Sequence, residues 1–196
     1  EDSTMAADPN RVILTGENPF IRLSETDGAP FSTNASFWRI ITSGAGPGHV
    51  LYLKSELTED KWRIYSDNIA MARWLQGTVQ GMLNEELKDL SIPVTDATFD
   101  KSGDARDFWT ETVDTVEETI ALTWYDIGDP LLIHTYPNQG PDPRPNGVCT
   151  VLNPTLGARL TRNGVQAKGL PFPRTRENRP FSTCALAFCE SWTEAR

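Results

Sequence analysis

Hydrophobic and polar positions alternate along most of this chain, and in one stretch the apolar positions recur at helical spacing instead. Short alternating or apolar runs bounded by turn residues are typical of strands. Strands are therefore predicted at residues 11–14, 36–42, 49–54, 62–65, 94–99, 107–113, 116–125, 131–136, 148–153, 158–161 and 181–192.

The helical spacing falls within residues 67–90, where apolar residues recur every three or four positions. Ser66 or Asp67 can cap this segment by accepting hydrogen bonds from the free N–H groups of its first turn. The pair Ile92-Pro93 ends it, because proline cannot continue a helix. We expect this to be the one principal helix of the protein.

Turn chemistry separates the predicted strands. Asn163-Gly164 predicts a tight hairpin, because both residues tolerate the left-handed conformation. Residues 15–30, which include Asn18-Pro19, are rich in turn formers, and residues 169–180 predict a long loop over one end of the sheet.

Many sequential strands with one helix predict a mainly β fold, an antiparallel barrel or half-barrel that the helix plugs or flanks. This arrangement resembles the calycin ligand barrels in architecture only. No motif carries the resemblance, so it assigns a role to no residue.

Length and charge limit the classes of protein that this chain can form. Its 196 residues suit one domain, here residues 11–196 after a flexible tail at residues 1–10. A net charge of −9 argues against nucleic acid or an anionic membrane as partner, since both attract positive surfaces. No apolar run approaches the roughly 20 residues of a membrane span.

The cysteines and histidines point to a protein without a cofactor. Three cysteines, an odd number, do not predict a disulfide framework, and reduced thiols favour a cytoplasmic location. With two histidines and no CxxC pair, a zinc site is not expected. No phosphate-binding loop or dinucleotide fingerprint is present, so we expect neither a metal nor a cofactor.

His134 is the leading candidate for acid–base chemistry. It interrupts the apolar run 131–136, and imidazole can give and take protons near neutral pH. Strand parity groups it with Leu132 and Tyr136, and we expect it to face a cavity. The alternative is an ordinary core histidine that is hydrogen-bonded to a neighbour.

Glu190 and Tyr125 complete the predicted catalytic group. Glu190 alternates with Phe188 and Trp192, and apolar surroundings would raise the pKa of its carboxyl group so that it could act as an acid. The alternative is a strand end that reaches solvent. The Tyr125 hydroxyl could stabilise charge that develops on a substrate oxygen.

Arg39, Trp38, Trp124 and Tyr136 are the predicted substrate-binding residues. Arg39 could hold a carboxylate with two hydrogen bonds, although a solvated surface arginine is the alternative. Trp38 would bury its ring on the opposite face of the same strand. Trp124 shares a strand face with other apolar residues, and Tyr136 could donate a hydrogen bond to the substrate.

These features favour a cofactor-free enzyme that acts by general acid–base proton transfer in a barrel cavity. Such a lyase, hydratase or isomerase would convert a small apolar or aromatic molecule. A non-catalytic, lipocalin-like binding protein is the first alternative, and a structural or interaction subunit is the second. A homo-oligomer is compatible with all three.

Overall fold

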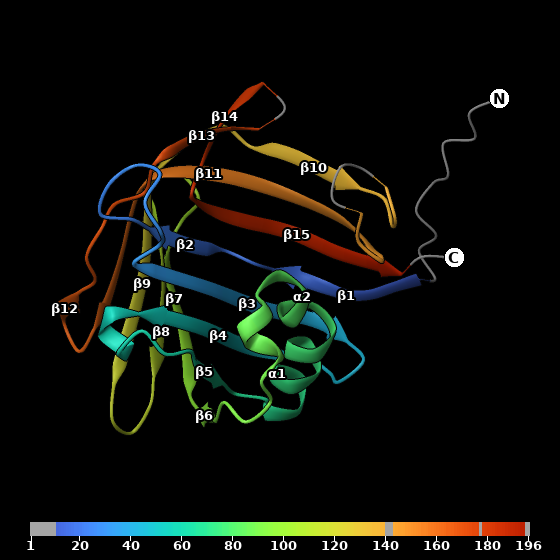
Figure 1. Ribbon diagram of the computed structural model, residues 1–196, viewed down its shortest axis with the longest axis horizontal. Coiled ribbons are helices and arrows are strands. Elements are labelled where there is room, and N and C mark those ends of the chain that lie inside the picture. The colour runs from blue at the N-terminus through green and yellow to red at the C-terminus, as the bar shows by residue number, and fades with distance from the viewer. Residues whose placement is uncertain (1–10, 140–142, 177, 195–196) are drawn as a thin grey trace.

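The computed structural model describes residues 11–139, 143–176 and 178–194, so the predicted tail at residues 1–10 lies outside the described residues. The strands are β1 (Val12–Glu17), β2 (Phe20–Leu23), β3 (Thr33–Ser43), β4 (Gly48–Ser55), β5 (Arg63–Ser66), β6 (Val94–Asp96), β7 (Thr98–Gly103), β8 (Phe108–Asp114), β9 (Thr119–Ile127), β10 (Leu131–Thr135), β11 (Asn146–Arg162), β12 (Val165–Gln166), β13 (Pro173–Arg176), β14 (Arg179–Ser182) and β15 (Cys184–Glu194). The prediction of a mainly β fold is confirmed (Figure 1).

Most strands join one large mixed sheet in the order β6-β5-β4-β3-β1-β15-β11-β9-β8-β7. All of its pairings are antiparallel except that of β5 with β6. The two ends of this order are consecutive in sequence, because only Ala97 separates β6 from β7. The Ala97 N–H donates to the Ser66 carbonyl on β5. One stretch of chain therefore contacts both ends of the sheet.

The sheet curls so that β7, β8 and β9 lie against β3 and β4 (Figure 1). We call the enclosed side the inner face. Its core includes Phe37, Trp124 and Leu186, none of which is exposed. The Phe99 ring of β7 stacks on His49 of β4 with 5.1 Å between ring centroids, which joins strands far apart in the strand order.

The opposite side, which we call the outer face, carries the helical segment. This segment comprises α1 (Ile69–Leu75), the π-helical turn η3 (Gln76–Gln80), α2 (Gly81–Leu83) and the 3₁₀ turn η4 (Glu85–Lys88), and a further 3₁₀ turn, η2 (Glu56–Thr58), follows β4. The helical segment covers a second core that includes Trp38, Tyr52 and Trp192. No helix in the described part of the chain is long and apolar enough to cross a membrane.

The predicted helix is therefore present, but its cap is Asn68 rather than Ser66 or Asp67. The Asn68 side chain accepts from the Met71 N–H at 3.1 Å. Ser66 is the last residue of β5, and the Asp67 carboxylate accepts from His49 instead. The Ser66 hydroxyl donates to the His49 carbonyl. Both expected caps therefore bond to His49 of the neighbouring strand β4 instead of capping the helix.

Turns differ from the prediction in three places. Residues 148–153 and 158–161 belong to one strand, β11, and the predicted loop 169–180 instead contains strand β13 and the start of β14, which pair as a hairpin. Asn18-Pro19 separates β1 from β2, which both pair with β3 and β15. The Asn163-Gly164 hairpin is confirmed, with φ angles of 50° and 78°.

Candidate functional site

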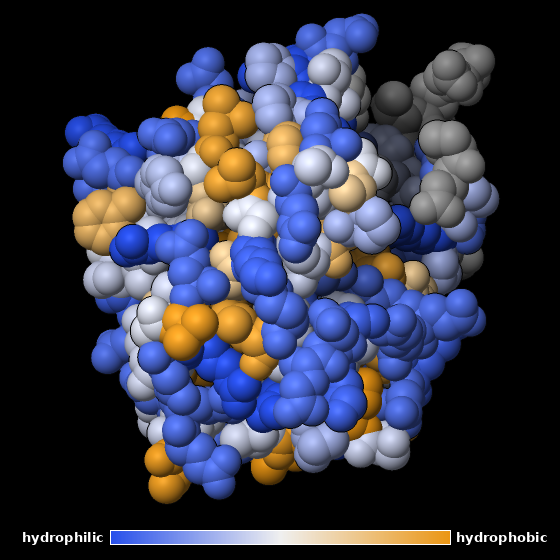
Figure 2. Space-filling model, turned by 60° about the vertical axis from the view of Figure 1, so that its left-hand side comes forward, coloured by the Kyte–Doolittle hydropathy of each residue, from blue (hydrophilic) through white to orange (hydrophobic). Residues whose placement is uncertain are grey.

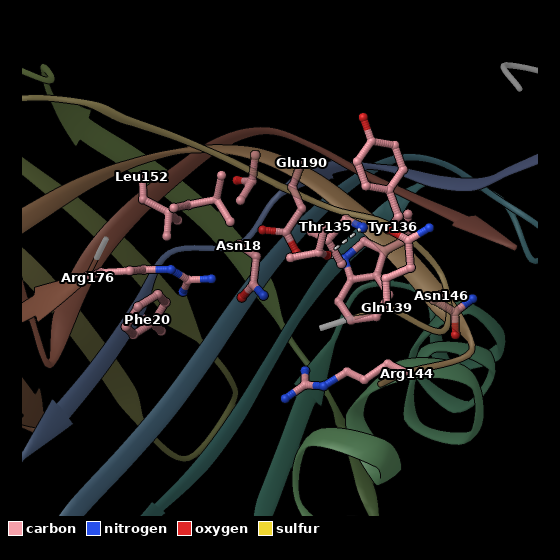
Figure 3. A pocket seen from close by; sticks show the side chains of 14 residues that line it. Asn18, Phe20, Thr135, Tyr136, Gln139, Arg144, Asn146, Leu152, Arg176 and Glu190 are labelled. Carbon is pink, nitrogen blue, oxygen red and sulfur yellow. Dashed lines mark hydrogen bonds between the residues drawn. The ribbon is translucent and has the colours of Figure 1, made fainter. Parts of the chain in front are cut away.

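A cavity of about 400 Å³ opens on the outer face, beside the core that the helical segment covers. Strands β2, β10, β11, β13 and β15 and the residues after β10 supply its walls (Figure 3). The lining residues are Asn18, Phe20, Ile133, Thr135, Tyr136, Gln139, Arg144, Asn146, Val148, Thr150, Leu152, Arg176, Glu190 and Trp192.

A β-bulge aims Glu190 into this cavity. Cys149 of β11 pairs with Ser191, whereas Val151 pairs with Phe188, so β15 has one extra residue at this point. Cys189 takes the left-handed conformation there, with φ 54°. The bulge places Glu190 on the same face as Trp192 and opposite Phe188. The predicted grouping of Phe188 with Glu190 is therefore wrong.

The Glu190 carboxyl group is buried in the cavity wall, with 5% of the residue exposed. Burial raises the pKa of Glu190 to about 6, because it disfavours the charged form. Hydrogen bonds from Trp192, Asn18 and Thr150 oppose this effect by stabilising the carboxylate. The Trp192 indole N–H donates to Oε1 of Glu190 at 2.7 Å. The alternative in which Glu190 reaches solvent is wrong.

A second set of contacts fixes the orientation of Asn18. The Ser36 hydroxyl accepts from the Trp38 indole at 3.1 Å and from the Gln80 amide at 3.0 Å. Its own proton then donates to Oδ1 of Asn18 at 3.2 Å. The amide nitrogen of Asn18 is thus left to donate to Glu190. The hydrogen bonds of Ser36 therefore orient the Asn18 amide as a donor to the Glu190 carboxylate.

Two arginines face the same space. In Figure 3 the guanidinium groups of Arg144 and Arg176 point from opposite sides towards the region beside Asn18, while the Glu190 carboxyl group points towards Asn18. Phe20, Ile133 and Leu152 supply the apolar part of the wall. The arrangement combines one buried carboxyl group, two cationic groups and an apolar surface.

The prediction that His134 faces the cavity is wrong. His134 pairs with Cys149 and is exposed, whereas its neighbour Ile133 is buried and lines the cavity. Strand β10 pairs with β11 alone and is therefore an edge strand, and of its two faces only the one that carries Leu131 and Ile133 is covered. The apolar run around His134 predicts a strand that is buried on both faces. In the structure this edge strand buries only Leu131 and Ile133.

Tyr136 is the other predicted residue that reaches the cavity. It follows the end of β10 at Thr135, so strand parity no longer relates it to His134. The two rings nevertheless remain in contact, with 4.4 Å between centroids. Glu190 and Tyr136 are therefore the two predicted site residues that the structure brings together in the cavity wall.

The remaining predicted aromatic residues lie elsewhere. Trp124 is in the inner core, where its indole N–H donates to the Phe20 carbonyl at 3.0 Å. Trp38 packs under the helical segment, with its ring centroid 6.4 Å from that of Trp192. Tyr125 is 39% exposed and its ring lies over Gly157, outside the cavity lining.

Arg39 does bind carboxylates, but they belong to the protein. Its guanidinium donates to both oxygens of Glu111, at 2.8 and 2.9 Å, and to Glu17. Arg39 Nε also donates to Nε2 of His49 at 3.2 Å, so the ring proton lies on Nδ1, facing Asp67. Arg39 therefore joins β1, β3, β4 and β8, and the alternative of a solvated surface arginine is also wrong.

Metal-binding side chains do not gather in the described part of the chain. No group of three or more histidine, cysteine, aspartate or glutamate side chains that could hold an ion occurs within residues 11–139, 143–176 and 178–194. Cys149, Cys184 and Cys189 are all free thiols. Burial raises the pKa of Cys184 to about 11, which leaves its thiol protonated and unreactive at neutral pH.

Sequence reasoning missed Asn18, Thr150, Arg144 and Arg176. Only Asn18 carries a local signal, since the following proline interrupts the strand and marks a place where a side chain can leave the sheet pattern. Arg144 lies in the proline-rich connection before β11, and Arg176 ends the short strand β13 in a segment where prolines interrupt any alternation. A scan against protein-family models and searches of curated proteins and of solved structures found no match to this chain.

Proposed function

We propose that the outer-face cavity binds a small, partly apolar molecule and that Glu190 transfers a proton to or from it. The protein would then be a cofactor-free lyase, hydratase or isomerase. The observation that carries this proposal is a buried carboxyl group, with a pKa of about 6, in the wall of a cavity. Such a group changes its protonation state near physiological pH, as general acid–base catalysis requires.

Above pH 6 most Glu190 is ionised, so it would act first as a base. A bound C–H, O–H or N–H group facing its carboxylate would give up a proton, and the protonated carboxyl group would return it at a second position. The indole of Trp192 and the amide of Asn18 hold the carboxylate in place during this cycle, while the Thr150 hydroxyl donates to the Phe188 carbonyl. Burial removes water from the Glu190 carboxylate, which makes it a stronger base.

The direct test uses 5-nitrobenzisoxazole, a flat aromatic probe of bases in apolar sites. Removal of its C3 proton breaks the N–O bond and releases a coloured cyanonitrophenolate, with no other reactant. We expect turnover by the intact protein that rises with pH and is half-maximal near pH 6. Glu190→Gln, which cannot accept the proton, should lower the rate by about 100-fold or more.

Glu111→Gln is the matched control. Glu111 is also buried, and it also accepts from an indole, that of Trp109 at 2.8 Å, but it lies outside the cavity lining. Circular dichroism of each variant establishes that it is folded. Equal rates for the parent and a folded Glu190→Gln across pH 5–8 would refute the proposal, and so would a parent rate that does not follow the ionisation near pH 6.

Non-catalytic binding is the second candidate, supported by the apolar wall and by the absence of another titratable carboxyl or imidazole group among the residues that line the cavity. A protein that binds the probe but leaves its rate of reaction unchanged would favour non-catalytic binding.

The role of a structural subunit has less support. On the face in Figure 2, hydrophobic residues form small groups separated by hydrophilic ones.

The proposal also includes a closed barrel. The continuous segment from β6 to β7 contacts β5 on one side and β8 on the other, which supports closure of the sheet into a calycin-like barrel. A cytoplasmic location, a small-molecule partner and no nucleic acid or membrane partner remain part of the proposal. Three free thiols and the net charge of −9 support it.

A further inference from the structure

We infer that the molecule bound in the outer-face cavity is a small organic anion, with an apolar or aromatic body and one carboxylate or similar oxyanion. This inference rests on the proposed function and adds the chemical class of the ligand. It comes from the distribution of charge and apolar surface around the cavity.

The cavity differs in charge from the rest of the protein. The chain as a whole carries a formal charge of −9. Among the residues that line the cavity, two guanidinium groups, Arg144 and Arg176, face one carboxyl group, Glu190. Arg176, which has no carboxylate partner within the described residues, gives this lining a cationic group that a ligand can meet. An anionic ligand therefore finds a locally attractive site on an acidic protein.

Arg176 is available for such a ligand. Its neighbours on the β13–β14 hairpin are engaged elsewhere: Arg174 pairs with Asp27 at 2.7 Å, and Arg179 donates to the Pro130 carbonyl. Within the described residues Arg176 has no carboxylate partner, and its side chain is directed into the cavity (Figure 3). A guanidinium group matches the two oxygens of a carboxylate with parallel hydrogen bonds.

The positions of the charges also orient the ligand. An ionised Glu190 repels an anionic group, so the oxyanion binds at Arg176 rather than beside Glu190. The apolar body then lies against Phe20, Ile133 and Leu152, and its opposite end reaches Glu190 and Trp192. A cavity of about 400 Å³ lies within the range of small-molecule sites. This orientation brings a ligand proton, rather than the oxyanion, to the catalytic carboxylate.

The test compares a pair of probes that differ mainly in charge, 3-phenylpropionate and 3-phenylpropanamide. Isothermal titration calorimetry at low salt gives the dissociation constant of each with the full chain. We expect the carboxylate to bind about tenfold more tightly than the amide. Arg176→Gln should weaken carboxylate binding by about tenfold and leave amide binding unchanged.

Arg174→Gln is the matched control, because it removes the same charge from the same strand but outside the cavity lining. It should leave both dissociation constants unchanged. Equal affinities of the parent for the two probes would overturn the anion inference and leave the proposed proton transfer standing. An equal loss of carboxylate binding in both arginine variants would also overturn it, because it would show a general charge effect. Failure of both probes to bind would overturn the inference together with the proposed function.

Discussion

Replacement of Glu190 by glutamine should change how the stability of the protein depends on pH. Burial raises the pKa of Glu190 to about 6, against an ordinary value of 4.5. Between these two pH values the folded protein binds more protons at this site than the unfolded chain does. Stability at this site is therefore fully present below pH 4.5 and falls as the pH rises through 6.

The magnitude follows from the pKa values. One pH unit corresponds to about 1.4 kcal/mol, so the difference between 4.5 and about 6 gives about 2 kcal/mol. Glu190→Gln removes the titration and keeps nearly the same shape and the acceptor for Trp192. Relative to the variant, the parent should lose about 2 kcal/mol of unfolding free energy between pH 4 and pH 7.

Urea denaturation of both proteins at closely spaced pH values measures this loss. Other titrating groups, including Glu111, whose pKa is also raised by burial, are present in both proteins and cancel in the difference. A difference between parent and variant that stays constant with pH would refute the reasoning, because Glu190 would then titrate alike in the folded and unfolded states. A difference of the opposite sign would show that its donors outweigh burial.

Substitutions at three further positions test the local geometry. Cys189→Gly should raise the free energy of unfolding by up to about 1 kcal/mol, because glycine adopts the left-handed conformation of the bulge without strain. Cys189→Val should lower it by more than 1 kcal/mol, because a β-branched side chain is strained in that conformation. Equal stability of the two variants in urea denaturation would contradict this prediction. His134→Gln should change stability by less than about 0.5 kcal/mol and leave turnover of the benzisoxazole probe unchanged, since the side chain is exposed outside the cavity; a large loss of rate would return His134 to the site. Gly16→Ala should lower the melting temperature and cost about 1–3 kcal/mol, because its Cβ would lie 2.3 Å from the backbone oxygen of Arg39; a variant as stable as the parent would mean that β1 and β3 are further apart.

Local patterns determined the class of fold and several of its parts. Alternation in β9 correctly placed Trp124 on a strand face shared with other apolar residues, because a regular strand keeps its period of two, and Ile120 and Leu122 are buried with it. Asn163-Gly164 determined a hairpin, since its backbone preference needs no distant contact. The helical spacing of residues 67–90 located the helical segment for the same reason.

Tertiary structure decided the site. One extra residue at the Cys189 bulge moved Glu190 to the face opposite Phe188, and sequence alternation cannot reveal such a shift. Whether His134 is buried depended on what packs over each face of β10, and the face that carries Leu132 and His134 is exposed. Strand period is a property of the local backbone, but burial and charge pairing arise only when segments distant in sequence meet. For this reason the sequence by itself identified the carboxyl group of the candidate site but not the arginines that face it.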